Sequence, residues 1–281
     1  MDIRQALATA CATLGLDRLD AQLLLLHALG RPQDDRAWLL AHDTDALAPE
    51  AEARYIDFTR RRASGVPLAY VTGVREFYGL KLQVDARVLD PRPDTETLVD
   101  WALDCLRKQA SPTVVDLGTG SGAIALAIKA QRPDARVIAV DASTEALTVA
   151  QANAHQLGLA VQFLQGNWLE PLRECVYGSS PHERAHLIVS NPPYIAEGDP
   201  HLMRLGHEPQ QALTSGPDGL DAVRSIITQA PTHLLPGGWL LLEHGWDQAA
   251  AVRSLLLQGG AQQVHSRLDL ADIERCSGGV F

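Results

Sequence analysis

Several features that are common in other protein classes are missing from this chain of 281 residues. No apolar run reaches about 18 residues without a charge, so we expect no segment that spans a membrane. The start, Met1-Asp2-Ile3-Arg4, lacks the basic stretch and the apolar block of a signal peptide. The four cysteines are scattered and form no Cys-x-x-Cys pair, which argues against disulfides and against a zinc ribbon. These absences predict a cytoplasmic protein.

An excess of positive charge is missing as well. The chain has 24 Lys and Arg against 34 Asp and Glu, which gives a net charge of −10. That balance argues against a nucleic-acid binder, so no direct nucleic-acid partner is expected. The basic run Arg60-Arg61-Arg62 is interpreted as the solvated end of a helix, although an acidic partner is the alternative.

The hydrophobic content of 46% is enough for a sizeable core, and the first part of the chain favours helices only. Gly15, Gly30 and Gly65 follow helical patterns as stop signals. Helices are predicted over residues 3–14, with Asp2 as the cap, 18–29, about 35–40 and 49–63. The alternation Leu80-x-Leu82-x-Val84 then predicts a β-hairpin. We therefore predict a helical docking domain over residues 1–70 and a hairpin linker over residues 71–90.

Residues 91–281 show strands and helices in alternation. Strands are predicted over residues 113–117, 136–141, 161–164, 186–190 and 239–243. Helices are predicted over residues 96–108, with Asp94 or Thr95 as the cap, 123–131, 145–156, 220–234 and 247–257. Repeated βα units of this kind predict a doubly wound, mostly parallel α/β sheet with right-handed crossovers.

A glycine loop joins the first strand of this sheet to its helix. In Asp116-Leu117-Gly118-Thr119-Gly120-Ser121-Gly122 the glycines let the backbone approach a ligand closely. Asp141, at the end of the next strand, can accept hydrogen bonds from ribose hydroxyls. The spacing Gly118-x-Gly120-x-x-Ala123 also fits a dinucleotide fingerprint, so a nicotinamide dehydrogenase competes here. The additional Gly122 and the acidic Asp116 look more like the loop of a class I methyltransferase, which binds S-adenosylmethionine.

Two further segments follow strand ends. Gly166-Asn167-Trp168 offers a polar side chain and an indole that could bind and cover an adenine ring; an ordinary loop is the alternative. Asn191-Pro192-Pro193-Tyr194 follows the buried fourth strand, and its two prolines hold the chain in one rigid, extended shape. Because open α/β sheets bind ligands at the carboxyl ends of their strands, this polar corner is a candidate site, with a plain proline-rich turn as the alternative.

One motif suggests a metal instead. His182-Glu183-Arg184-Ala185-His186 matches the zinc-protease pattern His-Glu-x-x-His, which needs both histidines on one helix face. Here Pro181 precedes the motif and His186 opens a strand, so a helix is not expected. We therefore predict no metal site.

The proline corner carries a more specific resemblance. Asn191-Pro192-Pro193-Tyr194 resembles the Asn/Asp-Pro-Pro-Tyr motif of methyltransferases that modify a planar amine or amide nitrogen. The helical domain and the segments 75–79, 91–96 and 241–245 resemble the HemK-type release factor glutamine methyltransferases over nearly the whole chain. The resemblance implies methyl transfer from S-adenosylmethionine to the glutamine amide nitrogen in the Gly-Gly-Gln motif of peptide chain release factors.

The same resemblance assigns roles to residues. It implies that the cofactor binds Gly118, Thr119, Gly120, Ser121, Gly122, Asp141, Asn167, Trp168 and Asn191. Asn191, Pro192, Pro193 and Tyr194 would bind the glutamine, with Asn191, Pro192 and Tyr194 as the catalytic candidates. Two departures stand out: Asn167 replaces a common Asp, and the loop at residues 204–209 is shorter than usual. A DNA or RNA exocyclic-amine methyltransferase and a non-catalytic adapter remain as alternatives.

Overall fold

The computed structural model describes residues 1–174 and 184–281, without the side chains of residues 173, 174 and 204. The chain forms two compact units, Met1–Val74 and Arg75–Phe281. Among the described residues, no helix combines the length and the apolar character that crossing a membrane requires.

The first unit contains five helices within its described residues. They are α1 (Ile3–Leu14), α2 (Arg18–Ala28), α3 (Arg36–Ala41), α4 (Pro49–Ala63) and α5 (Leu68–Thr72). Asp2 caps α1 as predicted, because its side chain accepts a hydrogen bond from the Gln5 backbone N–H at 2.7 Å. Leu24, Leu25 and Leu26 of α2 are fully buried in one core with Tyr55 of α4. Helix α5 was not predicted.

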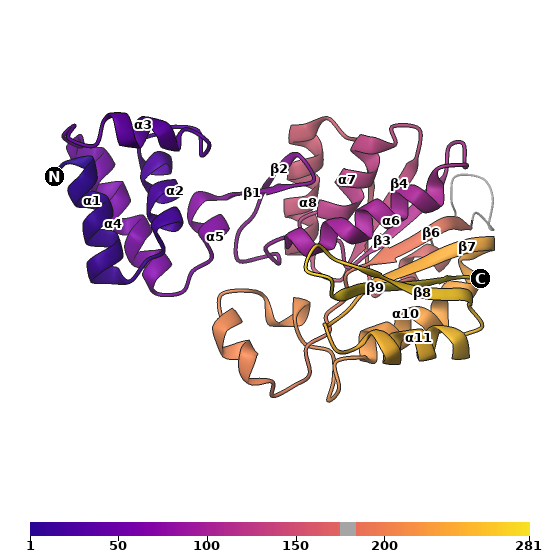
Figure 1. Ribbon diagram of the computed structural model, residues 1–281. Coiled ribbons are helices and arrows are strands. Elements are labelled where there is room, and N and C mark those ends of the chain that lie inside the picture. The colour runs from indigo at the N-terminus through magenta and orange to yellow at the C-terminus, as the bar shows by residue number, and fades with distance from the viewer. Residues whose placement is uncertain (175–183) are drawn as a thin grey trace. The chain divides into compact units, whose positions relative to one another are not determined.

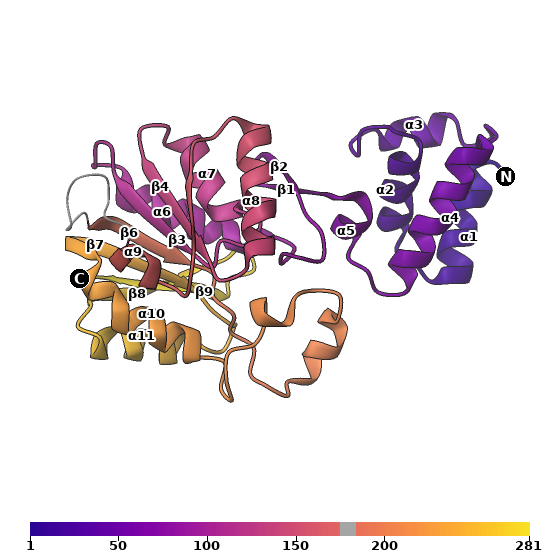
Figure 2. The same ribbon diagram turned by 180° about the vertical axis from the view of Figure 1, so that it is seen from behind.

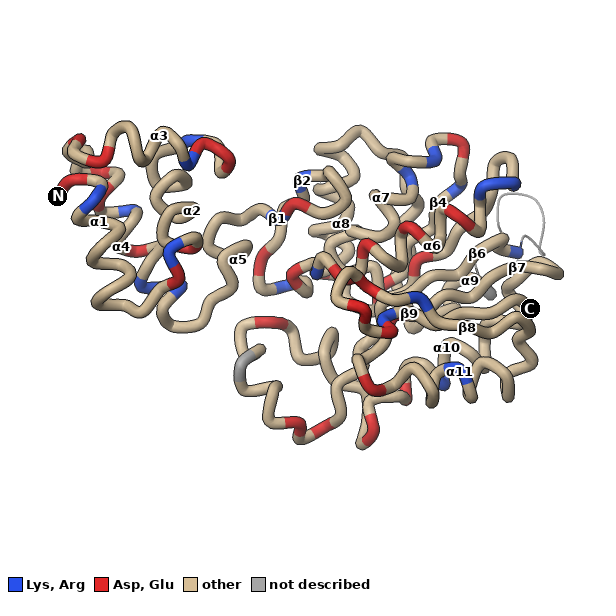
Figure 3. The backbone as a smooth tube through the Cα atoms, viewed as in Figure 1, with Lys and Arg blue, Asp and Glu red and all other residues tan. Residues whose placement is uncertain are grey.

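The basic run lies in the last turn of α4, where the helix dipole favours positive charge. Arg62 forms an ion pair with Asp20 at 2.7 Å, and Arg61 lies 4.0 Å from Asp57. The interpretation as a charged helix end is therefore confirmed. Basic residues (blue) are interspersed with acidic residues (red) along both units in Figure 3.

The predicted hairpin consists of β1 (Val74–Phe77) and β2 (Leu80–Gln83). Its two turn residues, Tyr78 and Gly79, have φ angles of +51° and +76°. Positive φ at both positions is typical of the tight turns whose twist matches that of the flanking strands.

The second unit is built on a seven-stranded sheet in the order β5-β4-β3-β6-β7-β9-β8. The strands are β3 (Thr113–Leu117), β4 (Arg136–Asp141), β5 (Gln162–Gln165), β6 (Ala185–Ser190), β7 (Leu234–Glu243), β8 (Gln262–Leu268) and β9 (Glu274–Val280). The first five pair in parallel, whereas β9 pairs antiparallel with β7 and β8. The doubly wound, mostly parallel sheet is confirmed.

Helices cover both faces of this sheet (Figures 1 and 2). On one face lie α6 (Glu96–Leu106), α7 (Ala123–Gln131) and α8 (Thr144–Leu157), and on the other α10 (Asp221–Gln229) and α11 (Ala249–Gln258). A short α9 (Glu170–Glu174) precedes the gap in the described residues. From β3 the chain continues outward to β4 and β5, and then returns to place β6 on the other side of β3. This reversal of strand order is the switch point at which open α/β sheets bind ligands.

One predicted helix boundary and one predicted helix cap were wrong. The helix predicted over residues 220–234 ends at Gln229, a 3₁₀ turn with Pro231 follows, and Leu234 already belongs to β7, where it pairs with Ala185. Pro231 has no backbone N–H with which to continue the helical hydrogen bonds, which explains the early end. The cap predicted for α6 is also absent, since neither Asp94 nor Thr95 makes a side-chain cap; a 3₁₀ turn over Pro93–Thr95 leads into the helix.

Candidate active site

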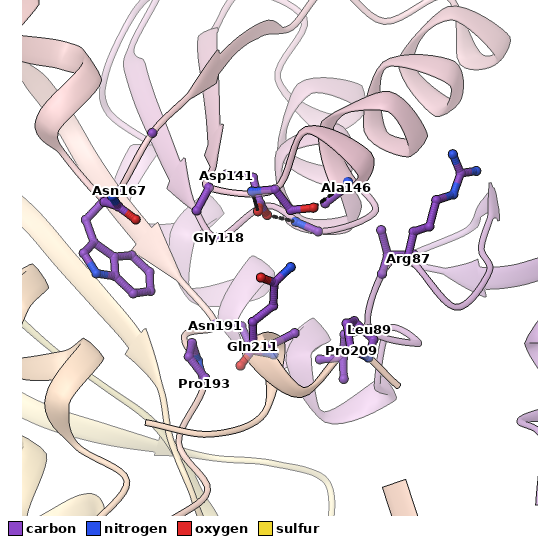
Figure 4. A pocket seen from close by; sticks show the side chains of 17 residues that line it. Arg87, Leu89, Gly118, Asp141, Ala146, Asn167, Asn191, Pro193, Pro209 and Gln211 are labelled. Carbon is purple, nitrogen blue, oxygen red and sulfur yellow. Dashed lines mark hydrogen bonds between the residues drawn. The ribbon is translucent and has the colours of Figure 1, made fainter. Parts of the chain in front are cut away.

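A cavity of about 320 Å³ lies at the carboxyl edge of the strands, beside the switch point. Figure 4 shows side chains from several separate segments converging on it. Of the residues predicted from the sequence, the cavity is lined by Gly118, Gly120, Asp141, Asn167, Trp168, Asn191 and Pro193. Ligand cavities are typically about 300–1,000 Å³, so this one can hold a molecule of nucleoside size.

The glycine loop is close to the indole of Trp168. Gly118 has φ +68°, and a Cβ atom there would lie 3.6 Å from the indole ring. Gly122, with φ +85°, would bring a Cβ within 3.0 Å of Leu126 in α7 and 3.2 Å of Ala150 in α8. A side chain at Gly118 would therefore narrow the cavity, and one at Gly122 would push the loop away from its helices.

Thr119 and Ser121 do not line the cavity but are buried beneath the loop. The Thr119 hydroxyl donates to Asp116 Oδ2 at 2.6 Å, and the Asn153 side chain donates to the Ser121 carbonyl at 2.9 Å. Both residues hold the loop in shape from below. The sequence placed them in the correct loop, but neither residue is among those that line the cavity.

Asp116 is fully buried at the end of β3. Its Oδ2 atom accepts from Thr119 and from the backbone N–H of Ala125 at 3.2 Å, whereas its Oδ1 atom has no hydrogen-bond partner among the described residues. Burial raises the pKa of Asp116 to about 7, because the charged form loses its hydration. Asp116 therefore connects the start of α7 to the glycine loop.

Asp141 connects β4 to the same loop. Its Oδ2 atom accepts from the backbone N–H of Gly120 at 2.8 Å, and its Oδ1 atom accepts from that of Ser143 at 2.9 Å (Figure 4). Burial raises the pKa of this carboxyl, and the backbone hydrogen bonds oppose the shift. A carboxylate offers about four lone-pair positions, so two remain for hydroxyl groups of a ligand in the cavity.

The segment after β5 supplies the part of the cavity wall next to the glycine loop. Trp168 is half-buried, with φ +50°, and Asn167 beside it is exposed on the cavity rim. A Cβ atom at Gly166 would lie 2.5 Å from the ring of Pro171, so only glycine fits there. Both predicted residues thus lie where a flat ring could be covered.

Asn191 follows β6 directly and lines the cavity (Figure 4). Ser190, the last residue of β6, donates its hydroxyl to the carbonyl of Leu117 in β3 at 2.7 Å. Asn191 Nδ2 donates to Thr95 Oγ1 at 3.2 Å. Pro192 is buried, and Pro193 lines the cavity.

Tyr194 is not among the residues that line the cavity. Burial raises the pKa of its hydroxyl to about 12, so the ring stays neutral. Its carbonyl accepts from Gln248 Nε2 at 3.0 Å, and a Cβ atom at Gly219 would lie 2.2 Å from that carbonyl oxygen. The Asn-Pro-Pro-Tyr segment is therefore fixed by contacts on both sides.

The metal motif is only partly visible, because His182 and Glu183 lie outside the described residues. His186 belongs to β6, and its Nδ1 atom accepts from the backbone N–H of Thr113 at 3.0 Å. Within the described residues, no group of three or more His, Cys, Asp or Glu side chains could hold a metal ion.

Two family models match the chain. The model described as the PrmC N-terminal domain matches residues 2–73, and that described as the methyltransferase small domain matches residues 95–216. The release factor glutamine methyltransferase of Bordetella pertussis is 52% identical over 95% of this chain and 96% of its own length. The release factor glutamine methyltransferase of Xylella fastidiosa is 50% identical over 96% of this chain and 95% of its own length. The chain belongs to the release factor glutamine methyltransferases. The resemblance inferred from the sequence is confirmed.

A solved structure shares the family's fold at low sequence identity. The human methyltransferase 10 domain containing protein aligns with a TM-score of 0.55 at 18% identity, over 80% of this chain and 96% of its own length. At that identity the likeness shows the fold alone.

Sequence reasoning missed part of the cavity wall in this family member. Arg87, Val88 and Leu89, which follow the hairpin, line the cavity, as do Pro209, Gln211 and Ala212. No local pattern marks Arg87–Leu89. The Glu208-Pro209 pair was a signal that could have been used. It was noted only as part of a shortened loop.

Proposed function

We infer that this chain transfers a methyl group from S-adenosylmethionine to the side-chain amide nitrogen of the glutamine in the Gly-Gly-Gln motif of peptide chain release factors. One observation carries the inference: Asn191 lies on the edge of a nucleoside-sized cavity in a chain about half identical, over nearly its full length, to release factor glutamine methyltransferases.

The residues around the cavity fit the cofactor. The open lone pairs of Asp141 suit ribose hydroxyls, the carbonyl oxygen of Asn167 can accept from an adenine amino group, and Trp168 can cover the ring. S-adenosylmethionine, when bound, supplies an electrophilic methyl group.

Asn191 and the following backbone act on the acceptor nitrogen. An amide nitrogen is a poor nucleophile because its lone pair is delocalised into the carbonyl group. Asn191 Oδ1 and the backbone carbonyl of Pro192 accept hydrogen bonds from the two amide hydrogens, and Tyr194 packs against the amide plane. These acceptors stabilise the positive charge that develops on nitrogen, a contribution of about 3–4 kcal/mol, and alignment of the reacting groups supplies up to about 7–11 kcal/mol.

A protein acceptor in the cytoplasm is favoured over a nucleic acid. The alternative substrate is an exocyclic amine of DNA or RNA, which the same Asn-Pro-Pro-Tyr segment could bind. The net charge of −10 gives little attraction for a phosphate backbone, which supports the protein substrate.

The test is transfer of an isotope-labelled methyl group from the cofactor to defined acceptors. We expect label in a purified release factor, and none in the same factor with its Gly-Gly-Gln glutamine replaced by alanine. Duplex DNA and ribosomal RNA serve as competing acceptors. Label in either nucleic acid, with an unlabelled release factor, would overturn the proposed function.

A further inference from the structure

Asn191 has a buried acidic neighbour that its role as an acceptor does not explain. The strands β6 and β7 run in parallel with Ser190 paired to Leu242. The next residues along the two strands, Asn191 and Glu243, therefore lie side by side at the carboxyl edge of the sheet. Side chains alternate between the two faces along each strand, and residues paired in register share a face. The side chains of Asn191 and Glu243 therefore project to the same face.

Thr95 completes a group of three. It is 4% exposed in the turn before α6, and its Oγ1 atom accepts from Asn191 Nδ2 at 3.2 Å. Glu243 is 1% exposed, and the Thr95 and Asn191 side chains both stabilise its charged form by hydrogen bonding. The positive charge of Arg275 acts in the same direction, and Asp94 opposes it.

A carboxylate in this place is costly for stability. Burial raises the pKa of Glu243 to about 7, and its Oε2 atom has no hydrogen-bond partner within the part of the chain that the structure describes. A buried carboxylate without full pairing destabilises a fold, and such groups concentrate at functional sites. Packing alone therefore gives no reason for an acid at this position.

We propose that Glu243 and Thr95 are positioning residues that turn the NH₂ group of Asn191 inward and leave its Oδ1 atom facing the acceptor amide. This proposal rests on the proposed function. A carboxamide presents two donors at one end and an acceptor at the other, and a half-turn about its last side-chain bond exchanges them. In the turned state Asn191 would present hydrogens to the hydrogens of the substrate amide.

The chemistry of the two neighbours selects one orientation. A carboxylate can only accept hydrogen bonds, so the Asn191 end that faces Glu243 must be the donor end. The Thr95 hydroxyl accepts a hydrogen bond from the same NH₂ group and can donate one to the Glu243 carboxylate. With both neighbours satisfied in this way, the acceptor end of Asn191 is held ready before substrate binds.

The first test removes the orienting groups without changing their shape. Glu243→Gln and Thr95→Val should each lower kcat for release factor methylation by roughly 10- to 100-fold, because a misplaced reacting group costs about that much. Affinity for S-adenosylmethionine, measured by calorimetry, should not change. Thr95→Ser keeps the hydroxyl and should restore kcat, and Glu274→Gln is the matched control on the neighbouring strand β9.

The second test asks whether Glu243 acts through Asn191. In an Asn191→Ala background, Glu243→Gln should cause no further loss of kcat, since the group that it orients is already gone. Measurements at about pH 8 keep the carboxyl ionised, above its pKa of about 7. A loss that is equally large in both backgrounds would mean a purely structural role and would overturn the proposal.

The outcomes separate this proposal from the proposed function. Full kcat in folded Glu243→Gln and Thr95→Val, with melting curves as the check on folding, overturns the positioning role alone. A wild-type protein that does not methylate release factors overturns the proposed function instead. If Glu243→Gln fails to fold, the comparison of kcat between Thr95→Val and Thr95→Ser still tests the positioning role.

Discussion

Arg92 and Glu208 form an ion pair across 116 residues of sequence. The Glu208 side chain is 3% exposed, and the guanidinium of Arg92 donates to its Oε1 atom. The Oε2 atom has no hydrogen-bond partner within residues 1–174 and 184–281. Pro209, the next residue, lines the cavity. The pair therefore ties the chain before α6 to the loop that closes one side of the cavity.

Arg92→Met should destabilise the second unit, because it leaves the Glu208 carboxylate buried without its partner. We expect a loss of roughly 2–3 kcal/mol in the free energy of unfolding, somewhat less than for a fully buried pair. Urea titration of the two proteins measures the difference. The double variant Arg92→Met with Glu208→Gln removes the charge as well and should recover most of the loss; an additive loss would contradict the pairing.

Gly219→Ala should damage catalysis more than stability. A Cβ atom at Gly219 would lie 2.2 Å from the Tyr194 carbonyl oxygen, so the Asn-Pro-Pro-Tyr segment must shift. We expect kcat/KM to fall by roughly 10- to 100-fold, the effect of a displacement of about 1 Å at a catalytic group. Gly237→Ala is the matched control, because Gly237 has a similar φ of +81° and no atom of the described residues lies within 4 Å of the added Cβ. Equal activity of the two variants would show that the segment accommodates the methyl group.

Stability should depend on pH through Asp116. Its pKa of about 7 in the folded protein lies above the value of about 3.9 for an unfolded chain. Between these values the folded state binds a proton that the unfolded state lacks, so stability falls as pH rises, by roughly 1.4 kcal/mol per pH unit. Above about pH 7 this contribution to the slope disappears.

Asp116→Asn removes this titrating group and should flatten that part of the curve. Urea unfolding of wild type and variant at about pH 5 and about pH 8 gives the comparison. Glu243, whose pKa is raised in the same direction, contributes equally in both proteins. The decisive quantity is therefore the difference in slope, and identical slopes would mean that Asp116 titrates in its ordinary range.

Trp168→Ala should weaken cofactor binding with little change in kcat at saturation. Stacking of an aromatic side chain on a base contributes about 1–3 kcal/mol, which predicts a rise in the dissociation constant of roughly 5- to 150-fold. Calorimetry with S-adenosylmethionine measures it, and Trp168→Phe should keep much of the affinity. Trp246 is 73% exposed and not among the cavity residues, so Trp246→Ala should leave affinity unchanged.

Asn191→Ala should separate catalysis from cofactor binding. Loss of one preorganised polar contact to the developing charge lowers turnover by about 10²–10³-fold. Affinity for the cofactor should stay nearly the same, because the other predicted binding residues remain. A variant that retains most of its methyl transfer would show that the assigned role of Asn191 is wrong.

The sequence predicted the elements whose signals are local. The buried run at Thr113–Leu117, the glycine loop after it and the polar corner at Asn191 are each encoded within a few consecutive residues. Helix α5 at Leu68–Thr72 was missed, because five residues are too few to show a helical period. The first part of β7 was missed as well, since Leu234 becomes a strand residue only through its pairing with Ala185.

The sequence by itself determined that an open α/β sheet carries a glycine loop, an acid and an Asn-Pro-Pro-Tyr corner on successive strand ends. Periodicity and glycine or proline chemistry act over short distances along the chain, so these features can be read without the fold. Only the tertiary structure decided that Glu243 lies beside Asn191, that Arg92 reaches Glu208 and that Arg87 forms part of the cavity wall. The first of these depends on strand order and register, and all three depend on the packing of segments far apart in sequence.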